Sequence, residues 1–343
     1  MALSKKQISD IRDELSSSQN PLFLFHDDAD GLCSFLLLYR LHGDGKGIVI
    51  KTTPRVTTQF LPKVAEYAPD KIFILDLAML DQEFVDAVKR PVIWIDHHDP
   101  QDLDNVKSYN PRRTGNDCHP VSYLCYLVAK QDQWISMCGS IGDWFLPPEF
   151  EEFRKEYPDL FEAEIKQPDD VLFETRFGEL IRILSFILKG KTGDVMKCVR
   201  ILTRIESPYE LLNRETAQAR YIYKRYAKIN DEYVHLRKDA LAAATDDPFL
   251  VFIYPDHKIS LTKDLANEVL HHHRDKIIII GREKDDEVKL SLRAQNHVIP
   301  PILQHALKGL NGYGGGHEHA CGACVKKAEF KMFLENFRGG IGN

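Results

Sequence analysis

The stretch Pro91-Val-Ile-Trp-Ile-Asp96-His97-His98-Asp99 joins a short apolar run to four consecutive polar side chains that can bind metal ions. Residues 92–95 predict a buried strand of a parallel sheet, because such strands read as unbroken apolar segments. Open α/β sheets bind their ligands at the carboxyl ends of their strands. Strand alternation should turn Asp96 and His98 one way and His97 the other, so that one or two of these groups face a common site. A polar turn that closes a strand is the commoner origin of such a cluster, but here the pattern recurs.

Three other segments of the chain place acidic groups in a similar way. Carboxylates this close together repel one another in a partly buried site unless a cation neutralises them. In the first segment, Gly31 lets the backbone turn tightly into a helix predicted at residues 32–41. The segments are His26-Asp27-Asp28-Ala29-Asp30-Gly31 after residues 22–25, Asp76 after residues 72–75, and Asp143 after residues 137–142. Four acidic turns in one chain favour a metal site over a structural explanation.

The order of the predicted elements indicates the fold class. Short apolar strands alternate with helices, which predicts an α/β fold with a doubly wound, mostly parallel sheet and the acidic turns along one of its edges. A charged helical region follows, and strands return at residue 249. We expect a catalytic metal-binding domain at residues 1–190, a helical connector at 191–245, and a smaller mixed-sheet α/β domain at 246–343.

Composition narrows the function classes. The 343 residues are 43% hydrophobic and 28% charged, enough for about two globular domains. Seven irregularly spaced cysteines argue against a disulfide framework. A net charge of -6 argues against broad binding of duplex nucleic acid through a basic face. No apolar segment resembles a signal peptide or a membrane span, so we expect a cytoplasmic protein with no membrane partner.

Near the C-terminus, a glycine-rich segment predicts a phosphate-binding loop. Its sequence is Gly312-Tyr313-Gly314-Gly315-Gly316-His317, and bare backbone amides of such a run can approach an anion closely. His317 could add a charge-assisted hydrogen bond and Arg293 a bidentate one. A flexible loop is the usual role of a glycine run, but the basic neighbours favour phosphate binding.

Three weaker features allow two explanations each. Cys321 and Cys324, with His317 and His319 nearby, could hold zinc, but we favour buried thiols because no second pair of cysteines exists. His271-His272-His273 most simply ends a helix. The basic residues of the helical stretch 210–244 could line a groove for a phosphate backbone, although a solvated helix is the commoner role.

Together, these motifs resemble the DHH family of phosphoesterases with a C-terminal DHHA1 domain, over almost the whole chain. Members include RecJ-like single-strand exonucleases, oligoribonuclease/pAp phosphatases and cyclic-dinucleotide phosphodiesterases. The compact opening motif, with His26 in its first position, looks closer to small archaeal RecJ-like proteins. The matching motifs are His26-x-Asp28-x-Asp30-Gly31, Asp76, Asp96-His97-His98, Gly142-Asp143, Ser291-Leu-Arg293 and Gly314-Gly-Gly-His317-x-x-Ala320-x-Gly322.

The resemblance implies a binuclear Mn²⁺ centre, for which Mg²⁺ or Co²⁺ could substitute; carboxylate oxygens and imidazole suit these ions. The ligands implied are His26, Asp28 and Asp76 for one ion, and Asp30, Asp76, His97 and Asp143 for the other, with Asp76 bridging. Two such ions can activate a water nucleophile and stabilise the leaving oxygen. The predicted catalytic residues are Asp76, Asp28 and His98, of which His98 would act on the phosphate from just outside the ligand set.

The resemblance also implies that the DHHA1 domain grips a substrate phosphate across a cleft, through Arg293, Gly314, Gly315, Gly316 and His317. We therefore predict metal-dependent hydrolysis of single-stranded or short oligonucleotides to mononucleotides, alone or beside protein partners of nucleic-acid processing. About twenty residues follow Gly322, the last glycine of this motif, too few for a further strand-capturing domain, which favours short substrates. One alternative keeps this chemistry on a small nucleotide such as a cyclic dinucleotide or pAp. Another is a catalytically idle scaffold in a nucleic-acid complex.

Overall fold

The computed structural model describes residues 2–51, 54–115, 118–256 and 259–341. The chain divides into two compact units, Met1–Tyr226 and Ala227–Asn343. The division falls within one long helix, α12 (Ala217–Ala242). The three-part division at residues 190 and 245 remains a prediction. Among the described residues, no helix is both long enough and apolar enough to cross a bilayer.

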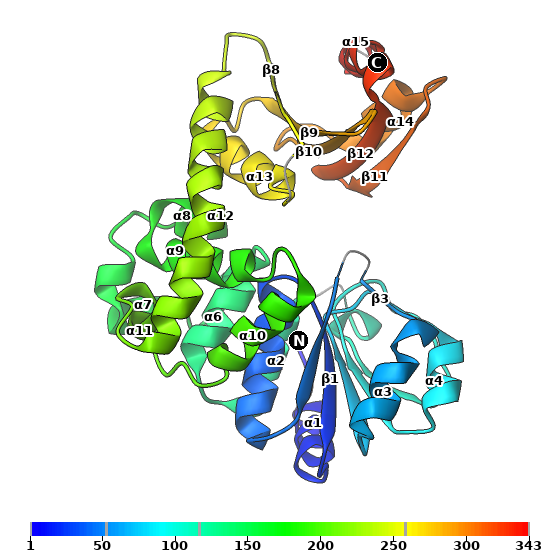
Figure 1. Cartoon of the computed structure of the whole chain (residues 1–343), viewed down its shortest axis with the longest axis vertical. Coiled ribbons are helices and arrows are strands. Elements are labelled where there is room, and N and C mark those ends of the chain that lie inside the picture. Colours follow the sequence, from blue (N-terminus) through cyan, green and yellow to red (C-terminus); the bar gives the residue numbers. More distant parts are fainter. Residues whose placement is uncertain (1, 52–53, 116–117, 257–258, 342–343) are drawn as a thin grey trace. The chain divides into compact units, whose positions relative to one another are not determined.

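The first unit is built on a five-stranded sheet in the order β2-β1-β4-β6-β7, in which all neighbours are parallel (Figure 1). The chain runs outward from β1 to β2 and then returns to β4 on the other side of β1. The strand order therefore reverses between β1 and β4, the point at which open sheets of this kind bind ligands. The strands are β1 (Pro21–His26), β2 (Lys46–Ile50), β4 (Lys71–Leu75), β6 (Val92–Ile95) and β7 (Val106–Tyr109).

Helices cover both faces of this sheet, which confirms the predicted doubly wound fold. Leu22 and Leu24 of β1 point toward α3 and α4 and share one apolar core with them. Phe25 points to the opposite face, where its ring stacks on Phe35 of α2. The helices are α1 (Lys5–Ser16), α2 (Ala29–His42), α3 (Leu61–Tyr67) and α4 (Gln82–Val88). A separate parallel pair consists of β3 (Arg55–Val56) and β5 (Met79–Leu80).

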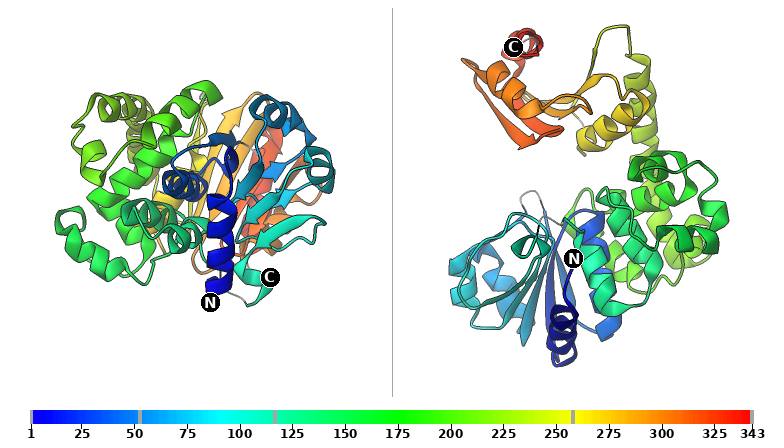
Figure 2. Two further views of the ribbon diagram at one scale, coloured as in Figure 1. Left: turned by 90° about the horizontal axis from the view of Figure 1, so that it is seen from below. Right: turned by 180° about the vertical axis from the view of Figure 1, so that it is seen from behind.

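The rest of the first unit is helical and extends from α2, on which α5 and α6 pack directly (Figure 2). Residues 137–142 belong to α6, so Asp143 follows a helix, unlike the other acidic turns, which follow strands. The segment is apolar over a full helical turn and packs on α2 as well as on its neighbours. The helices are α5 (Val121–Ala129), α6 (Gln133–Gly142), α7 (Phe150–Glu156), α8 (Pro168–Glu174), α9 (Arg176–Ile187), α10 (Thr192–Leu202) and α11 (Pro208–Leu212).

The basic residues of α12 are partly used inside the fold. Arg225 donates to the carbonyl oxygens of Ile187 and Lys189 at the end of α9. Arg237 lies 2.8 Å from the buried carboxylate of Glu268 in the second unit. These contacts favour the structural role of the helix over a groove for a phosphate backbone.

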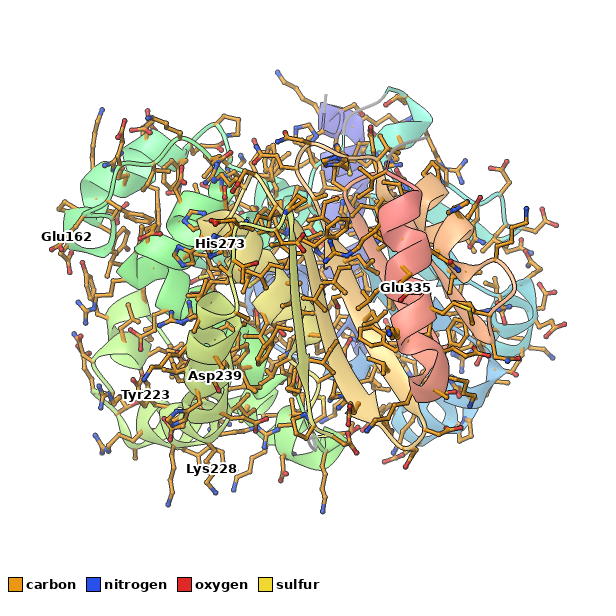
Figure 3. The ribbon with its side chains drawn as sticks, turned by 90° about the horizontal axis from the view of Figure 1, so that it is seen from above. Glu162, Tyr223, Lys228, Asp239, His273 and Glu335 are labelled. Carbon is orange, nitrogen blue, oxygen red and sulfur yellow. The ribbon has the colours of Figure 1, made fainter. Side chains whose placement is uncertain are left out.

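The second unit contains a mixed five-stranded sheet in the order β11-β12-β10-β9-β8. Its apolar core lies between one face of the sheet and the helices α14 and α15, and Figure 3 shows α15, which carries the exposed Glu335, along the strands. On the opposite face, α13 packs on β9 and β10. The elements are β8 (Phe249–Tyr254), α13 (Thr262–His272), β9 (Ile277–Lys284), β10 (Glu287–Arg293), α14 (Ile299–Leu307), β11 (Gly312–His317), β12 (Ala320–Lys326) and α15 (Phe330–Gly339).

The prediction of a loop at the glycine run is wrong. Residues 312–317 form β11, the edge strand of this sheet, paired in antiparallel register with β12. The segment lacks β-branched residues, but each residue finds a pairing partner in β12, and this tertiary pairing overrides the low strand propensity of glycine.

Candidate metal centre and substrate face

The first predicted ligands lie in the turn between β1 and α2. Asp28 is the N-cap of α2, where its Oδ1 accepts a hydrogen bond from the Gly31 amide at 3.0 Å. The other oxygen, Oδ2, lies 2.8 Å from Nδ1 of His26, the last residue of β1. Gly31 lies inside the helix, and a Cβ there would come within 2.6 Å of the His26 carbonyl oxygen. Glycine is thus required for close approach of α2 to β1, and not for the turn that we predicted.

Asp76, directly after β4, is the most central of the predicted ligands. Its backbone is left-handed, with φ of 56°, a conformation that Asp adopts more readily than most residues. The buried carboxylate lies between two histidines, with Oδ1 3.4 Å from His97 Nε2 and Oδ2 3.4 Å from His26 Nδ1. Oδ2 accepts no hydrogen bond of normal geometry from the described residues. A buried anionic oxygen is therefore left for another partner.

The three residues after β6 divide into one that faces the carboxylates and two that support each other. His97 Nε2 faces Asp76, and its Nδ1 lies 3.7 Å from Asp143 Oδ2. Asp96 is buried, and its carboxylate holds His98 at two atoms. Asp96 Oδ1 lies 2.8 Å from His98 Nδ1, and the His98 backbone amide donates to Asp96 Oδ2 at 2.9 Å. Because Nδ1 of His98 is occupied by Asp96, Nε2 is the atom that can meet a ligand.

Asp30 and Asp143 reach the centre from the helical side. Asp30 is buried, and its two oxygens accept hydrogen bonds from the Val121 and Ser122 amides, each at 2.8 Å, at the N-terminus of α5. Asp143 caps the C-terminus of α6. A Cβ on Gly142 would lie 2.8 Å from a Cβ of α2, so glycine lets the two helices approach and brings Asp143 to the β1 turn.

The structure brings all six predicted metal ligands together. In three groups of side chains, one ligand atom of each member lies within 4.8 Å of the others. The groups are His26, Asp28 and Asp76; Asp30, His97 and Asp143; and Asp76, His97 and His98. Asp76 joins the first and third groups but not the one that contains Asp30 and Asp143. The assignment of ligands to individual ions, and the bridging role of Asp76, remain predictions.

The electrostatics of the centre suit divalent cations. When all four carboxylates of the centre are ionised, they carry four negative charges, which two divalent ions would balance. Burial, followed by the charges of Asp76 and Asp143, raises the pKa of Asp30 well above its usual value. Burial alone would lower the pKa of His97, but hydrogen bonds with Asp76 and Cys118 raise it to about 12. Such shifts mark a site short of positive charge, and oxygen and imidazole ligands fit Mn²⁺ or Mg²⁺.

The sequence analysis did not predict two residues that lie near the centre, Asn110 and Cys118. Asn110 Nδ2 donates to the His98 carbonyl at 2.9 Å. It follows β7, a short strand at the sheet edge that was not predicted, so the recurring pattern of strand and polar turn went unrecognised there. Cys118 Sγ lies 3.5 Å from His97 Nδ1, and no spacing in the sequence relates it to the other motifs.

The predicted phosphate-binding residues Arg293, Gly315 and His317 lie on one face of the second sheet. Paired residues of neighbouring strands share a face, as do residues two apart along a strand. The register therefore puts His317, Ala320 and Arg293 in one row, and Gly315, Gly322 and Ser291 in the next. The helices α14 and α15 cover the opposite face. The exposed part of this face, at Gly315, Gly322 and His317, is called the glycine face below.

Arg293 is a cation held by neutral groups at the border of the glycine face. Its Nε donates to Asn267 Oδ1 of α13 at 2.6 Å, and its Nη1 donates to the Leu292 carbonyl at 2.8 Å. Among the described residues, no carboxylate forms an ion pair with it. Burial lowers the pKa of Arg293 to about 10, which leaves it charged at neutral pH. A desolvated guanidinium of this kind favours an anionic ligand.

The three consecutive glycines, Gly314, Gly315 and Gly316, differ in whether the structure requires glycine at their positions. A Cβ on Gly314 would lie 2.8 Å from the Gly322 carbonyl oxygen, and one on Gly316, where φ is 150°, would lie 2.4 Å from the Ala320 carbonyl oxygen. Packing and backbone conformation thus explain Gly314 and Gly316. A Cβ on Gly315 would meet no atom of the described residues within 4 Å. Only Gly315 has no structural reason to be glycine, so of the three it is the best candidate for contact with a ligand.

The zinc alternative at Cys321 and Cys324 fails on geometry. Both thiols are free and buried in β12. They lie three positions apart along a strand, with two residues between them, so their side chains point to opposite faces of the sheet. Buried thiols, the favoured prediction, agree with this arrangement.

Comparison with protein families matches two segments. Residues 22–141 match the N-terminal domain of the DHH family, and residues 248–341 match the DHHA1 domain. An uncharacterized protein of Methanocaldococcus jannaschii is 22% identical over 334 residues, which cover 88% of this chain and 85% of that protein.

Two solved structures are similar to this chain over nearly its whole length. RecJ of Thermus thermophilus in complex with Mn²⁺ superposes with a TM-score of 0.67 at 16% identity, over 97% of this chain. The chain spans only about half, 54%, of that protein. A pGpG-specific phosphodiesterase of Vibrio cholerae superposes with a TM-score of 0.52 at 12% identity, over 94% of this chain and 100% of that one. At these identities the similarity establishes the fold.

Proposed function

The chain belongs to the DHH family and carries a C-terminal DHHA1 domain, and we propose that it is a metal-dependent phosphodiesterase that hydrolyses single-stranded or short oligonucleotides to mononucleotides. The observation that carries the proposal is the meeting of six carboxylate and imidazole groups, linked through Asp76 and His97, at the point where the strand order of the sheet reverses. Family membership supports phosphoester hydrolysis; the substrate and the number of ions are our inference.

Each residue of the centre has a proposed task. His26, Asp28, Asp30, Asp76, His97 and Asp143 would hold two Mn²⁺ ions, or Mg²⁺ or Co²⁺ in their place. When bound, such ions would supply Lewis-acid stabilisation of the phosphate and lower the pKa of a water nucleophile. His98, oriented by Asp96, would direct its Nε2 to a phosphate oxygen and donate a hydrogen bond. Attack of water on phosphorus would break the P–O bond to the leaving group, whose oxygen takes up a proton, and so release a nucleoside monophosphate from a strand that ends in a free hydroxyl.

The glycine face is the proposed binding surface for a substrate phosphate, through Arg293, His317 and the run Gly314–Gly316. Because this run is a strand and not a loop, it cannot wrap an anion in convergent amides. Contact would instead come from the flat backbone at Gly315 and from the side chains of the neighbouring row. Gly314 and Gly316 would contribute by setting the course of the strand.

The experiment is digestion of end-labelled DNA and RNA single strands of two to about twenty nucleotides with added Mn²⁺, with cyclic dinucleotides and pAp alongside. The proposal expects stepwise shortening, and the label that disappears first gives the polarity. Turnover confined to dinucleotides, pAp or cyclic species would select the small-nucleotide alternative, which the structural similarity to a pGpG phosphodiesterase favours. Metal binding without turnover of any substrate would overturn the enzyme and leave the scaffold alternative.

A further inference from the structure

We propose that Trp144 is a stacking platform for a nucleobase of the substrate, and therefore that the metal centre acts on nucleotides in preference to base-free phosphoesters. This inference rests on the proposed phosphodiesterase activity and specifies its substrate class. Trp144 is 45% exposed although it directly follows Asp143, one of the predicted metal ligands. A tryptophan with nearly half of its surface exposed has an aromatic face to offer to a ligand.

The backbone of Trp144 is unfavourable for a bulky residue. Its φ is 62°, in the left-handed region that glycine or asparagine would adopt at lower cost. Nothing in the turn requires tryptophan there: the Trp144 amide donates to the Ile141 carbonyl at 3.0 Å, a bond that any residue except proline would make. A strained position occupied by a large side chain indicates a use for that side chain.

Backbone hydrogen bonds hold the turn that carries Trp144, which directly follows the candidate metal ligand Asp143. The Asp143 amide donates to the Gly139 carbonyl at 3.0 Å, and the Phe145 amide donates to the Ser140 carbonyl at 2.9 Å. Both flanking residues are thus tied to α6. The Asp143 carboxylate in turn lies 3.7 Å from His97 Nδ1. Consecutive Cα atoms lie about 3.8 Å apart, so the indole is near enough to reach the base of a nucleotide whose phosphate is bound at the Asp143 carboxylate.

Neighbouring aromatic residues do not bury the indole. Phe145, on the other side of the turn, packs with its ring 5.1 Å from His119 and 5.5 Å from Tyr123, and so anchors the turn in the fold. Phe173 of α8 lies 6.4 Å from Trp144 at a tilt of 58°, which supports the indole at its side without stacking on it. The described surroundings thus fix the orientation of Trp144 while leaving nearly half of its surface exposed.

Stacking on an aromatic side chain is recognition that tolerates any base, because every base has a π-face. Carboxylates and metal ions would recognise the phosphate alone and could not distinguish an oligonucleotide from an inorganic polyphosphate. Trp144 would add that distinction. We therefore expect it to affect KM for nucleotides and to leave kcat nearly unchanged.

The test measures KM of the wild type and of Trp144→Gly for a set of trinucleotides. One trinucleotide carries all three bases, and each of the other three lacks the base at a different position. Glycine suits φ of 62°, so this variant should fold at least as stably as the wild type. At one site, removal of the base should raise KM of the wild type about tenfold, an effect of about 1.4 kcal/mol, and should not change KM of the variant. Trp144→Phe should keep most of the preference. Tyr221→Ala, which removes an exposed aromatic residue of α12, is the matched control and should behave as the wild type.

A preference for the base that persists unchanged in Trp144→Gly would overturn the inference. So would equal KM values of the wild type for all substrates. Failure of the proposed function is a separate outcome, since the wild type would then turn over none of them. In that case the same comparison is read from equilibrium binding by fluorescence polarisation. Loss of base-dependent binding in Trp144→Gly would support the inference. Binding to the wild type that does not depend on the base would contradict it.

Discussion

The metal centre and the glycine face are built in opposite ways. At the candidate metal centre the side chains are crowded and buried or half-buried. Neighbours hold several of them: two helix amides hold Asp30, Asp96 holds His98, and a left-handed turn positions Asp76. On the glycine face the deciding feature is the lack of a side chain at Gly315, over an exposed backbone. Neighbouring carboxylates repel one another, so the fold must hold them in place. A surface that binds substrate must instead lack side chains that would block the substrate. Mutations should therefore alter chemistry in the first region and access in the second.

The largest effect should come from Asp76→Asn. This change keeps the shape of the side chain but removes the central negative charge, so turnover should fall by about three orders of magnitude or more, which corresponds to about 4 kcal/mol of lost transition-state stabilisation. Steady-state hydrolysis of a short oligonucleotide measures it. Asp86→Asn, at an exposed carboxylate of α4, is the control and should retain full activity. An active Asp76→Asn variant would contradict the account of the centre.

A smaller loss is expected when the proposed catalytic residue His98 is kept and the residue that orients it is changed. Asp96→Asn leaves His98 in place but weakens the hydrogen bonds that orient its ring, so kcat should fall by about 10- to 100-fold while the affinity for Mn²⁺ stays the same. Kinetics and isothermal titration calorimetry measure the two quantities. His98→Gln should lose a similar amount, and the double variant no more, because the pair acts as a unit. Additive losses would show that Asp96 and His98 act independently.

On the glycine face, two adjacent alanine substitutions should separate binding from folding. Gly315→Ala meets no atom, so its stability should stay the same or rise by about 0.5–1 kcal/mol, since glycine is costly inside a strand. Its KM should nevertheless rise about tenfold, or about 1.4 kcal/mol. Gly314→Ala would come within 2.8 Å of the Gly322 carbonyl and should lose about 1–3 kcal/mol of stability. Thermal unfolding and KM measure both; identical behaviour of the two variants would refute the distinction.

The mildest test compares thiols in the two regions. The hydrogen bond from His97, together with Arg112, lowers the pKa of the exposed Cys118 to about 7, whereas burial raises the pKa of Cys321 and of Cys324. The thiolate is the reactive form, so alkylation of Cys118 in the metal-free protein should increase as pH rises through about 7 and then level off. Mass spectrometry after brief iodoacetamide treatment at about pH 5.5 to 9 gives the profile. Reaction that begins only above about pH 8.5, the range of an ordinary thiol, or that modifies Cys321 first, would contradict these surroundings.

The meeting of the candidate metal ligands could be predicted from sequence because several of them follow the carboxyl ends of apolar strands. His26, Asp76 and His97 each end or follow a strand whose hydrophobic run is unambiguous, and parallel pairing brings those ends together. For the glycine face, the sequence could predict which residues take part but not their secondary structure. Local propensity favours a loop at 312–317, and the pairing with β12 that makes it a strand depends on residues outside the segment.

Contacts that depend on packing could not be predicted from the sequence in either region. Cys118 approaches His97 through a turn that no motif marks. Asp143 ends a helix, because the apolar stretch before it packs on α2 and does not enter the sheet. The different reasons for the three glycines also depend on neighbours in β12.

The central claim is that the six clustered ligands hold two ions and that both are needed for hydrolysis. The most direct measurement titrates the metal-stripped chain with Mn²⁺ by isothermal titration calorimetry, while hydrolysis of a short oligonucleotide is followed at each addition. The account predicts two equivalents per chain and activity that appears with the second. Full activity in excess EDTA, or after one equivalent, would contradict it.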